Sequence, residues 1–215
     1  MSEGHFTQLV SEMPTGMAYQ WLSRLVIPRP IALVSSRSAE GQANLAPFSF
    51  FMLGGSNPPS VVFCPTLDLT GNPKDTLRNI QDTEEIVINL VDRTMADGLN
   101  VTSYPYPPEI DEWPLAGFTR VASQLVQPER VAESKVQLEC KLFQIVAHGT
   151  GASSSAYVIG EVVAIHIDHS LMEDDLLQEF QPIARLGGRA YLDLNGGKVF
   201  EMTRPNEKPA PSEDM

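Results

Sequence analysis

Residues 44–51 have side chains and backbone groups that suit the binding of a flat ring with polar edges. Their sequence, NLAPFSFF, places an amide, a hydroxyl and a proline-restricted backbone beside three phenylalanines. Free backbone N–H and C=O groups can pair with the edge of a heterocycle, while the aromatic wall excludes water. The alternative is an ordinary strand that enters the core through an Asx-type turn.

A second candidate site is the start of a predicted helix at Asn72. Asn72 is a good N-cap, Pro73 fits the first helical position, and Asp75 takes the third, as in a capping box. The unpaired N–H groups of a helix start favour phosphate, and Lys74 and Thr76 add a charge and a hydroxyl. Asp75 would repel a phosphate unless it turns back to cap the helix. An ordinary capped surface helix is the alternative.

The third candidate is the stretch PIARLGGR at 182–189, with Tyr191 close behind. Two arginines flank a glycine pair, and bare backbone there allows a ligand or another chain to approach closely. The alternative is a turn with solvated arginines.

The remaining reactive residues match no catalytic or metal-binding motif. Four histidines and two cysteines, Cys64 and Cys140, occur without HExxH, CxxC or any zinc-type spacing, so we expect no metal site. There is no GxSxG, Walker A or GxGxxG motif. Both cysteines lie in apolar runs, where a buried, inert thiol is the expected state.

The charge composition of the chain argues against some classes of binding partner. The chain has 215 residues and a net charge of −12, with 15 Lys+Arg against 27 Asp+Glu, which argues against nucleic acid and anionic membranes as partners. The N-terminus lacks the features of a signal peptide and no apolar run is long enough to span a membrane, so we expect a cytoplasmic protein. One domain over residues 1–202 and a loose polar tail over 203–215 are predicted.

Short apolar runs predict strands at 31–35, 61–64, 85–91, 136–146 and 157–167, and helices are expected only at 17–25 and after Asn72. The last two strands flank a Gly/Ser loop and form a plausible antiparallel pair, with a bulge at Gly160. Alternation in the first of them predicts that Gln137, Glu139 and Lys141 face solvent. This density of strands favours a mainly β fold, a barrel with helical insertions.

Taken together and in order, these segments resemble the flavin reductase-like, FMN-binding split-barrel family, of the flavoredoxin type. The matching stretches are PRPIALVSS at 28–36, residues 44–51, NPP at 57–59, Lys74-Asp75-Thr76 with Asn79, residues 85–89, VQLEC at 136–140, GEV at 160–162, and RLGG at 185–188 with Tyr191. They cover residues 15 to 195, and eight weak motifs in register make a strong signal.

The resemblance implies an antiparallel split β-barrel that binds FMN non-covalently, as a homodimer with the flavin near the subunit boundary. The family's flavin-binding positions correspond here to Ser35, Ser36, Lys74, Asp75 and Thr76 at the phosphate and ribityl end, to Asn44, Leu45, Ala46, Pro47 and Ser49 along the ring, and to Arg185, Leu186, Gly187, Gly188 and Tyr191 in the closing segment. No side chain is required as a catalytic group, because the flavin N5 accepts the hydride.

One departure separates the functional hypotheses. Short-chain flavin reductases of this superfamily often carry Gly-Asp-His before the long strand, where this chain has SSSAY at 153–157, and His148 lies on the other side of the loop. An NADH- or NADPH-dependent FMN oxidoreductase is expected first. The alternatives are an FMN-binding electron carrier that works with a redox partner protein and lacks its own nicotinamide site, and a split barrel that only binds. The segment YPYPP at 104–108 could form a lid or a rigid surface loop.

Overall fold

The protein is described by a computed structural model that covers residues 4–14 and 16–206. The helices are α1 (Met17–Leu25), α2 (Asp75–Thr83), α3 (Ala96–Val101) and α4 (Glu112–Ala116), with 3-10 turns at Val10–Glu12, Arg93–Met95 and His169–Leu171. The longer strands are β2 (Ala32–Arg37), β3 (Ala43–Phe48), β4 (Phe51–Ser56), β5 (Pro59–Phe63), β6 (Glu85–Leu90), β9 (Val136–His148) and β10 (Ser155–Ile167). The shorter ones are β1 (Arg29–Pro30), β7 (Arg120–Val121), β8 (Arg130–Val131), β11 (Met172–Glu173), β12 (Leu176–Leu177), β13 (Ile183–Arg185), β14 (Ala190–Asp193) and β15 (Lys198–Glu201).

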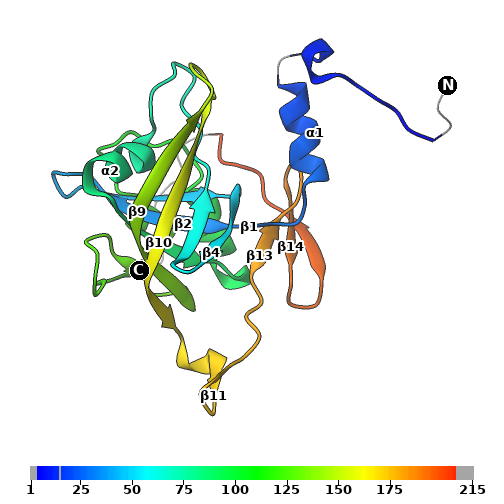
Figure 1. Cartoon of the computed structure of the whole chain (residues 1–215). Coiled ribbons are helices and arrows are strands. Elements are labelled where there is room, and N and C mark those ends of the chain that lie inside the picture. Colours follow the sequence, from blue (N-terminus) through cyan, green and yellow to red (C-terminus); the bar gives the residue numbers. More distant parts are fainter. Residues whose placement is uncertain (1–3, 15, 207–215) are drawn as a thin grey trace.

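A seven-stranded antiparallel sheet forms the body, in the order β3-β2-β6-β9-β10-β5-β4. Its two edge strands, β3 and β4, are separated in the chain only by Ser49 and Phe50. Because the three Cα–Cα steps from Phe48 to Phe51 span at most about 11 Å, the sheet must curl until its edges meet at that point. The fold is therefore the expected one, a mainly β antiparallel split barrel with helical insertions (Figure 1).

Strand β2 contributes side chains to two hydrophobic cores, one on each of its faces. Ala32 and Val34 point into the barrel, where they pack with residues such as Phe63 and Ile88. Leu33 points the other way, into a core that contains Trp113 and Ile183. A strand that is apolar on both faces is buried on both, which explains why this segment has no polar face in the sequence.

The long hairpin β9–β10 forms as predicted, and the register of the pair shifts at Ile159/Gly160, where a bulge was expected. The solvated face predicted for β9 is wrong at two positions. Gln137 and Glu139 are buried, because the segment that contains β7 and β8 folds over them. Glu139 accepts hydrogen bonds from the backbone N–H groups of Gln124 and Leu125 at 2.8 and 2.7 Å and contacts His166 at 2.6 Å. Charged residues with partners in a covering loop cannot be recognised from strand periodicity.

Helix α2 begins later than the sequence predicts. Its N-cap is Lys74, not Asn72. The reason lies just before it, where the Asp68 carboxylate accepts hydrogen bonds from the backbone N–H groups of Thr70 and Asn72, both at 2.8 Å. This closed turn, in which Asp68 N–H also bonds to the Asn72 carbonyl, holds Asn72 outside the helix.

The smaller sheet, β1-β13-β14-β15, lies beside the barrel at the foot of α1 (Figure 1). Helix α1 has the predicted bounds, yet it contains no buried residue and stands upright beside the body. The Arg29 guanidinium fixes its end by donating to the carbonyl oxygens of Ser23 and Val26, at 2.6 and 2.7 Å.

Candidate functional site

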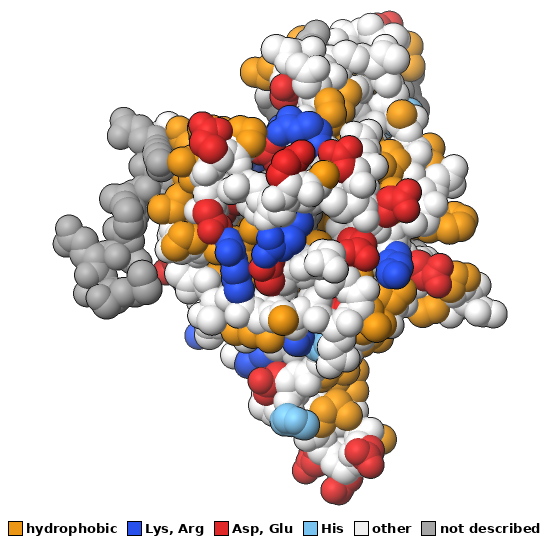
Figure 2. Space-filling view, turned by 90° about the vertical axis from the view of Figure 1, so that its left-hand side faces the viewer, with side chains coloured by type: hydrophobic (Ala, Val, Ile, Leu, Met, Phe, Trp, Pro, Cys, Tyr) orange, Lys and Arg blue, Asp and Glu red, His pale blue; other side chains and the backbone are white. Residues whose placement is uncertain are grey.

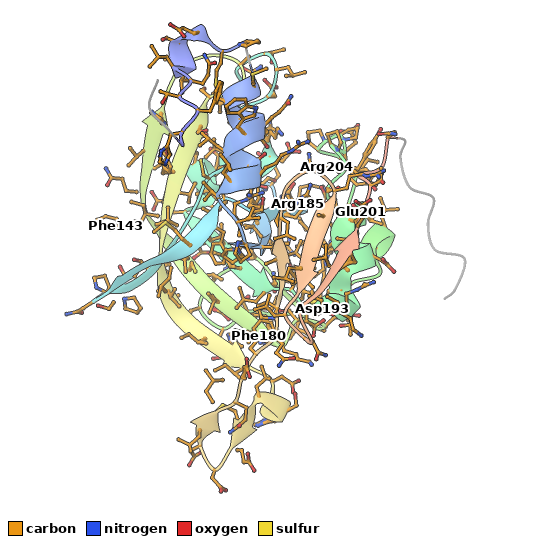
Figure 3. All side chains as sticks on the ribbon, turned by 90° about the vertical axis from the view of Figure 1, so that its right-hand side faces the viewer. Phe143, Phe180, Arg185, Asp193, Glu201 and Arg204 are labelled. Atoms are coloured by element: carbon orange, nitrogen blue, oxygen red, sulfur yellow. The ribbon has the colours of Figure 1, made fainter. Side chains whose placement is uncertain are left out.

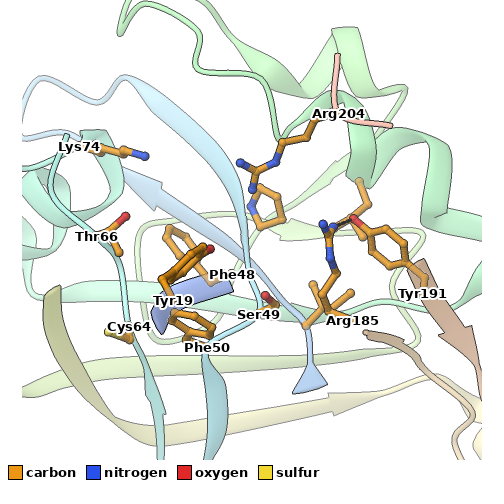
Figure 4. A pocket seen from close by; sticks show the side chains of 13 residues that line it. Tyr19, Phe48, Ser49, Phe50, Cys64, Thr66, Lys74, Arg185, Tyr191 and Arg204 are labelled. Carbon is orange, nitrogen blue, oxygen red and sulfur yellow. Dashed lines mark hydrogen bonds between the residues drawn. The ribbon is translucent and has the colours of Figure 1, made fainter. Parts of the chain in front are cut away.

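A pocket opens where the chain passes from β3 to β4. It is lined by residues from α1, the β3–β4 link, the end of β5, the start of α2, α3, the small sheet and the segment after β15 (Figure 4). These lining residues are Tyr19, Ile31, Pro47, Phe48, Ser49, Phe50, Cys64, Thr66, Lys74, Leu99, Arg185, Tyr191 and Arg204. Segments near positions 47, 74 and 185 therefore share one cavity.

The charges in this pocket have one sign. Lys74, Arg185 and Arg204 line it, and none of the described lining residues is Asp or Glu. This is unusual in a chain with 27 acidic and 15 basic residues. On the outer surface in Figure 2 acidic and basic side chains are interleaved. The pocket is thus a local site of positive potential that attracts an anion.

Aromatic rings form one wall of the pocket. Tyr19 of α1 meets Phe50 edge-on with ring centroids 6.1 Å apart, and Phe48 packs on the core residue Phe63 at 5.1 Å. The Arg29 guanidinium lies over the Phe50 ring at 5.6 Å. Such a wall offers flat apolar surface to a planar ligand.

Arg185 is held in place by its own strand pair. Its guanidinium stacks on the Tyr191 ring at 4.4 Å and donates to the Tyr191 hydroxyl and the Gly188 carbonyl oxygen. The buried Arg29 lies close enough that burial and then the Arg185 charge lower its pKa. These partners are neutral, so they leave the positive charge of Arg185 uncompensated. Arg185 lines the pocket and contributes that charge to it.

A polar network joins β2, β3 and α2. Asn44 Nδ2 donates to Thr76 Oγ1 at 2.9 Å and to Ser36 Oγ at 3.3 Å, and Asn79 Nδ2 donates to Ser36 Oγ at 3.0 Å. All four side chains are buried. The network fixes the start of α2, and with it Lys74, against the strand that leads to Pro47 and Ser49.

Residues 22–184 match the model of the flavin reductase like domain. The chain belongs to the flavin reductase-like family. An uncharacterized protein of Halalkalibacterium halodurans is 36% identical over 191 residues, covering 87% of this chain and 90% of that protein.

Two solved structures are similar to this flavin reductase-like chain at 30% identity. Nitrilotriacetate monooxygenase component B from Bacillus cereus aligns with a TM-score of 0.85 over 94% of this chain and 100% of that one. The 2-nitrobenzoate 2-nitroreductase NbaA of Pseudomonas fluorescens aligns at 0.79 over 95% and 99%. Membership of this family makes the protein a flavin-related oxidoreductase.

The structure separates the residues that the resemblance assigned to the flavin. Pro47, Ser49, Lys74, Arg185 and Tyr191 line the pocket. Ser36, Asn44 and Thr76 form the buried network, and Asn44 lines a separate cavity together with Asn79 and Asp75. The buried Ser35 hydroxyl has no hydrogen-bond partner among the described residues. Leu45 is buried, and Ala46 lies beside it on β3.

Two of the assigned segments point elsewhere. Asp75 forms an ion pair with Arg78 and lines a separate cavity on the other side of α2 with Asp82 and Glu109, so it does not face Lys74's pocket. Leu186, Gly187 and Gly188 form the β13–β14 turn under α1, where a Cβ on Gly187 would lie 2.5 Å from Arg24 Cγ. These three support α1 and Arg185 and do not line the pocket as described.

Sequence reasoning missed several lining residues, chiefly Tyr19, Thr66 and Arg204. Arg204 lies in the segment expected to be a loose tail, of which residues 207–215 fall outside the described part of the chain. No local signal marks these positions, because each reaches the pocket only through the packing of distant elements.

Of the cysteines and His148, only Cys64 lines the pocket. Cys64 is half-buried and lines the pocket, and burial raises the pKa of its thiol, whereas Cys140 is fully buried with a pKa raised by burial to about 12. His148 stacks on Tyr157 near the hairpin loop and lies outside the pocket lining. Among the described residues, no group of three or more His, Cys, Asp and Glu is placed to hold a metal.

The 104–108 segment is a surface loop in which Pro105, Pro107 and Pro108 are exposed and Tyr106 anchors it to the body. Tyr106 is buried, as is the nearby Trp113, and neither lines the pocket. No helix within the described ranges combines the length and apolar character of a membrane span.

Buried Glu112 lies behind β3. Its Oε2 accepts a hydrogen bond from the Leu45 backbone N–H at 3.2 Å. Burial raises the pKa of Glu112 to about 7, and the neighbouring Asp111 carboxylate acts in the same direction. Glu112 therefore covers the free edge of the strand that leads into the pocket.

Proposed function

We propose that this protein binds FMN in the cationic pocket and is an NAD(P)H-dependent oxidoreductase. The observation that carries the proposal is the lining itself: three cations, no described carboxylate, and an aromatic wall, in a chain of net charge −12. FMN combines a phosphate with a planar aromatic ring, so it matches both features of the pocket.

The start of α2 supplies the phosphate end. Lys74 is the N-cap residue, so its ammonium group and the first unpaired N–H groups of the helix are close in the chain. The Ser36–Asn44–Thr76–Asn79 network keeps this end at a fixed place relative to β3.

The link between β3 and β4 supplies the ring end. The split of the barrel leaves the Ser49 backbone outside both strands, where it is available to pair with a ring edge. The carbonyl oxygen of the neighbouring Phe50 already accepts a hydrogen bond from the Cys64 backbone N–H at 2.8 Å. Tyr19, Phe48 and Phe50 provide stacking surface and exclude water. Bound flavin supplies hydride or electron transfer, so the protein side chains need only bind, orient and shield the ring.

A second candidate, an FMN-dependent electron carrier that receives electrons from a redox partner protein, is favoured by one observation. His148, the only substitute for the missing Gly-Asp-His histidine that the sequence suggests, lies outside the pocket lining. The third hypothesis is a non-enzymatic split-barrel binding protein. In such a protein the cationic pocket would have no redox role.

One spectroscopic experiment separates these three. Purified protein incubated with FMN should gain flavin absorption at about 450 nm that bleaches anaerobically with NADH or NADPH. A carrier would bleach only with dithionite or a partner reductase. A protein that binds no FMN and gains no thermal stability from it would contradict the proposal.

We also propose that the active form is a homodimer. Helix α1 buries none of its side chains within the described chain, and its apolar residues Leu22 and Leu25 are exposed, as are Met52 and Leu53 on β4. Tyr19 of the same helix lines the pocket, so a second copy that covered this face would lie at the boundary of the flavin site. Two free cysteines suit a reducing cytoplasm, the compartment we propose.

A further inference from the structure

The pocket's cations fall into two groups on opposite sides. Lys74 lies at the start of α2, whereas Arg185 comes from β13 and Arg204 from the segment after β15 (Figure 4). Figure 3 shows Arg185 and Arg204 on the same side of the molecule, beside α1. In this view Lys74 and Arg204 face each other across a gap, Tyr19, Phe48 and Phe50 lie below it, and Tyr191 lies beside Arg185.

Neither group has a carboxylate partner in the part of the chain that the structure describes. Within the described residues, none of Lys74, Arg185 and Arg204 takes part in a salt bridge, although other arginines, such as Arg37 and Arg189, pair with glutamates. Cations gathered without counter-charges repel one another, and an anion on each side removes that repulsion.

Arg204 is held at the pocket by its neighbours in the chain. Asn100 Nδ2 donates to the Thr203 carbonyl oxygen at 2.9 Å, and Arg189 donates to Thr203 Oγ1 at 3.2 Å. The Met202 backbone N–H bonds to the Arg189 carbonyl oxygen at 3.0 Å, and the Met202 side chain packs on the core. The segment up to Thr203 is thus anchored, and it presents Arg204 to the cavity.

We propose that Arg204, supported by Arg185, binds a phosphate of the nicotinamide dinucleotide and so sets the protein's affinity for that co-substrate. This inference rests on the proposed function. FMN has one phosphate, which the Lys74 side accounts for, so the second cationic side requires an anion from a different molecule. The hydride donor must lie against the flavin ring, and its phosphates then fall within the same cavity.

The nicotinamide nucleotides contain two kinds of phosphate group that an arginine can bind. The diphosphate occurs in both NADH and NADPH, and the 2′-phosphate occurs in NADPH alone. An arginine bound to the diphosphate affects both nucleotides equally, whereas one bound to the 2′-phosphate affects only NADPH.

The test measures anaerobic bleaching of the FMN-loaded protein against NADH and NADPH concentration. Arg204→Gln should raise the half-saturating concentration of at least one nucleotide about tenfold and leave the limiting bleaching rate within about twofold. Arg204→Lys should restore part of the affinity. Lys198→Gln removes an equal charge from the exposed start of β15, outside the pocket, and should behave as wild type.

Binding of FMN is measured on the same variants and separates the two proposals. If Arg204→Gln weakens FMN binding and leaves nucleotide saturation unchanged, Arg204 belongs to the flavin phosphate and the inference is overturned. Flavin-loaded wild type that reacts with neither NADH nor NADPH overturns it as well, while FMN binding stands. Failure of the wild type to bind FMN at all would instead reject the proposed function.

Discussion

Lys74 and Asp75 are adjacent in the sequence, but their side chains line different cavities. Lys74 occupies the N-cap position of α2, makes no side-chain capping bond and lines the pocket, whereas Asp75 pairs with Arg78 and lines a separate cavity. This resolves the conflict that the sequence raised, in which a carboxylate beside a proposed phosphate site would repel the ligand. The two side chains diverge where the backbone changes from the extended conformation of Lys74 to the helical one of Asp75.

At this position we expect Lys74→Gln to weaken FMN binding about tenfold, because a charge-assisted contact with the phosphate is lost. Flavin fluorescence titration measures the change. Riboflavin, which has no phosphate, should bind wild type and variant equally. Lys141→Gln, on the exposed part of β9, is the matched control, and an equal loss there would point to a general charge effect.

Glu112 gives the protein a pH dependence of known sign. Its pKa is raised to about 7 in the folded protein, above the usual carboxyl value, so the folded state holds the proton more tightly than the unfolded one. Its contribution to stability is therefore full at low pH and decreases as pH rises toward about 7, by about 3 kcal/mol in total.

Glu112→Gln should abolish this decrease, because the amide cannot ionise and can still accept from Leu45 N–H. Melting temperatures of variant and wild type should be similar at about pH 5 and should diverge in favour of the variant at about pH 8. A constant difference across that range would show that Glu112 does not titrate there.

At the scale of elements, α1 packs closely on the small sheet at Gly187, in addition to the hydrogen bonds that it accepts from Arg29. Gly187 has no side chain where a Cβ would meet Arg24 Cγ at 2.5 Å and Arg24 Cα at 3.0 Å. The backbone of α1 can therefore approach the β13–β14 turn, and Tyr19 is thereby placed in the pocket.

Gly187→Ala should displace α1 and weaken FMN binding by about threefold to tenfold, with little loss of overall stability because α1 buries no residues. Titration and limited proteolysis of the α1 segment report the two effects. Adding Arg24→Ala removes the nearest clashing atom and should restore part of the affinity. If Gly187→Ala binds FMN as wild type, α1 is not part of the site.

For the whole molecule, the exposed apolar face makes the homodimer testable. Leu22→Glu on α1 or Leu53→Glu on β4 should convert a two-chain species to single chains, because a buried unpaired carboxylate opposes association. Sedimentation analysis measures the mass. Leu69→Glu changes a leucine that is even more exposed, in the turn before α2, and should leave the mass unchanged. A wild-type protein that sediments as one chain would reject the homodimer.

The sequence by itself determined strands β2, β5, β6, β9 and β10, the bulge at Gly160, helix α1 and the family, since these depend on local periodicity and on motifs in order. It did not predict strands β3 and β4, the small sheet, or helices α3 and α4. Only the tertiary structure decided that Glu139 is buried, that Asp75 turns away, and that Arg204 and Tyr19 join Lys74 around one cavity. The physical reason is that burial and convergence depend on which distant segment covers a residue. That information lies in the pairing of the whole chain and in no single stretch of it.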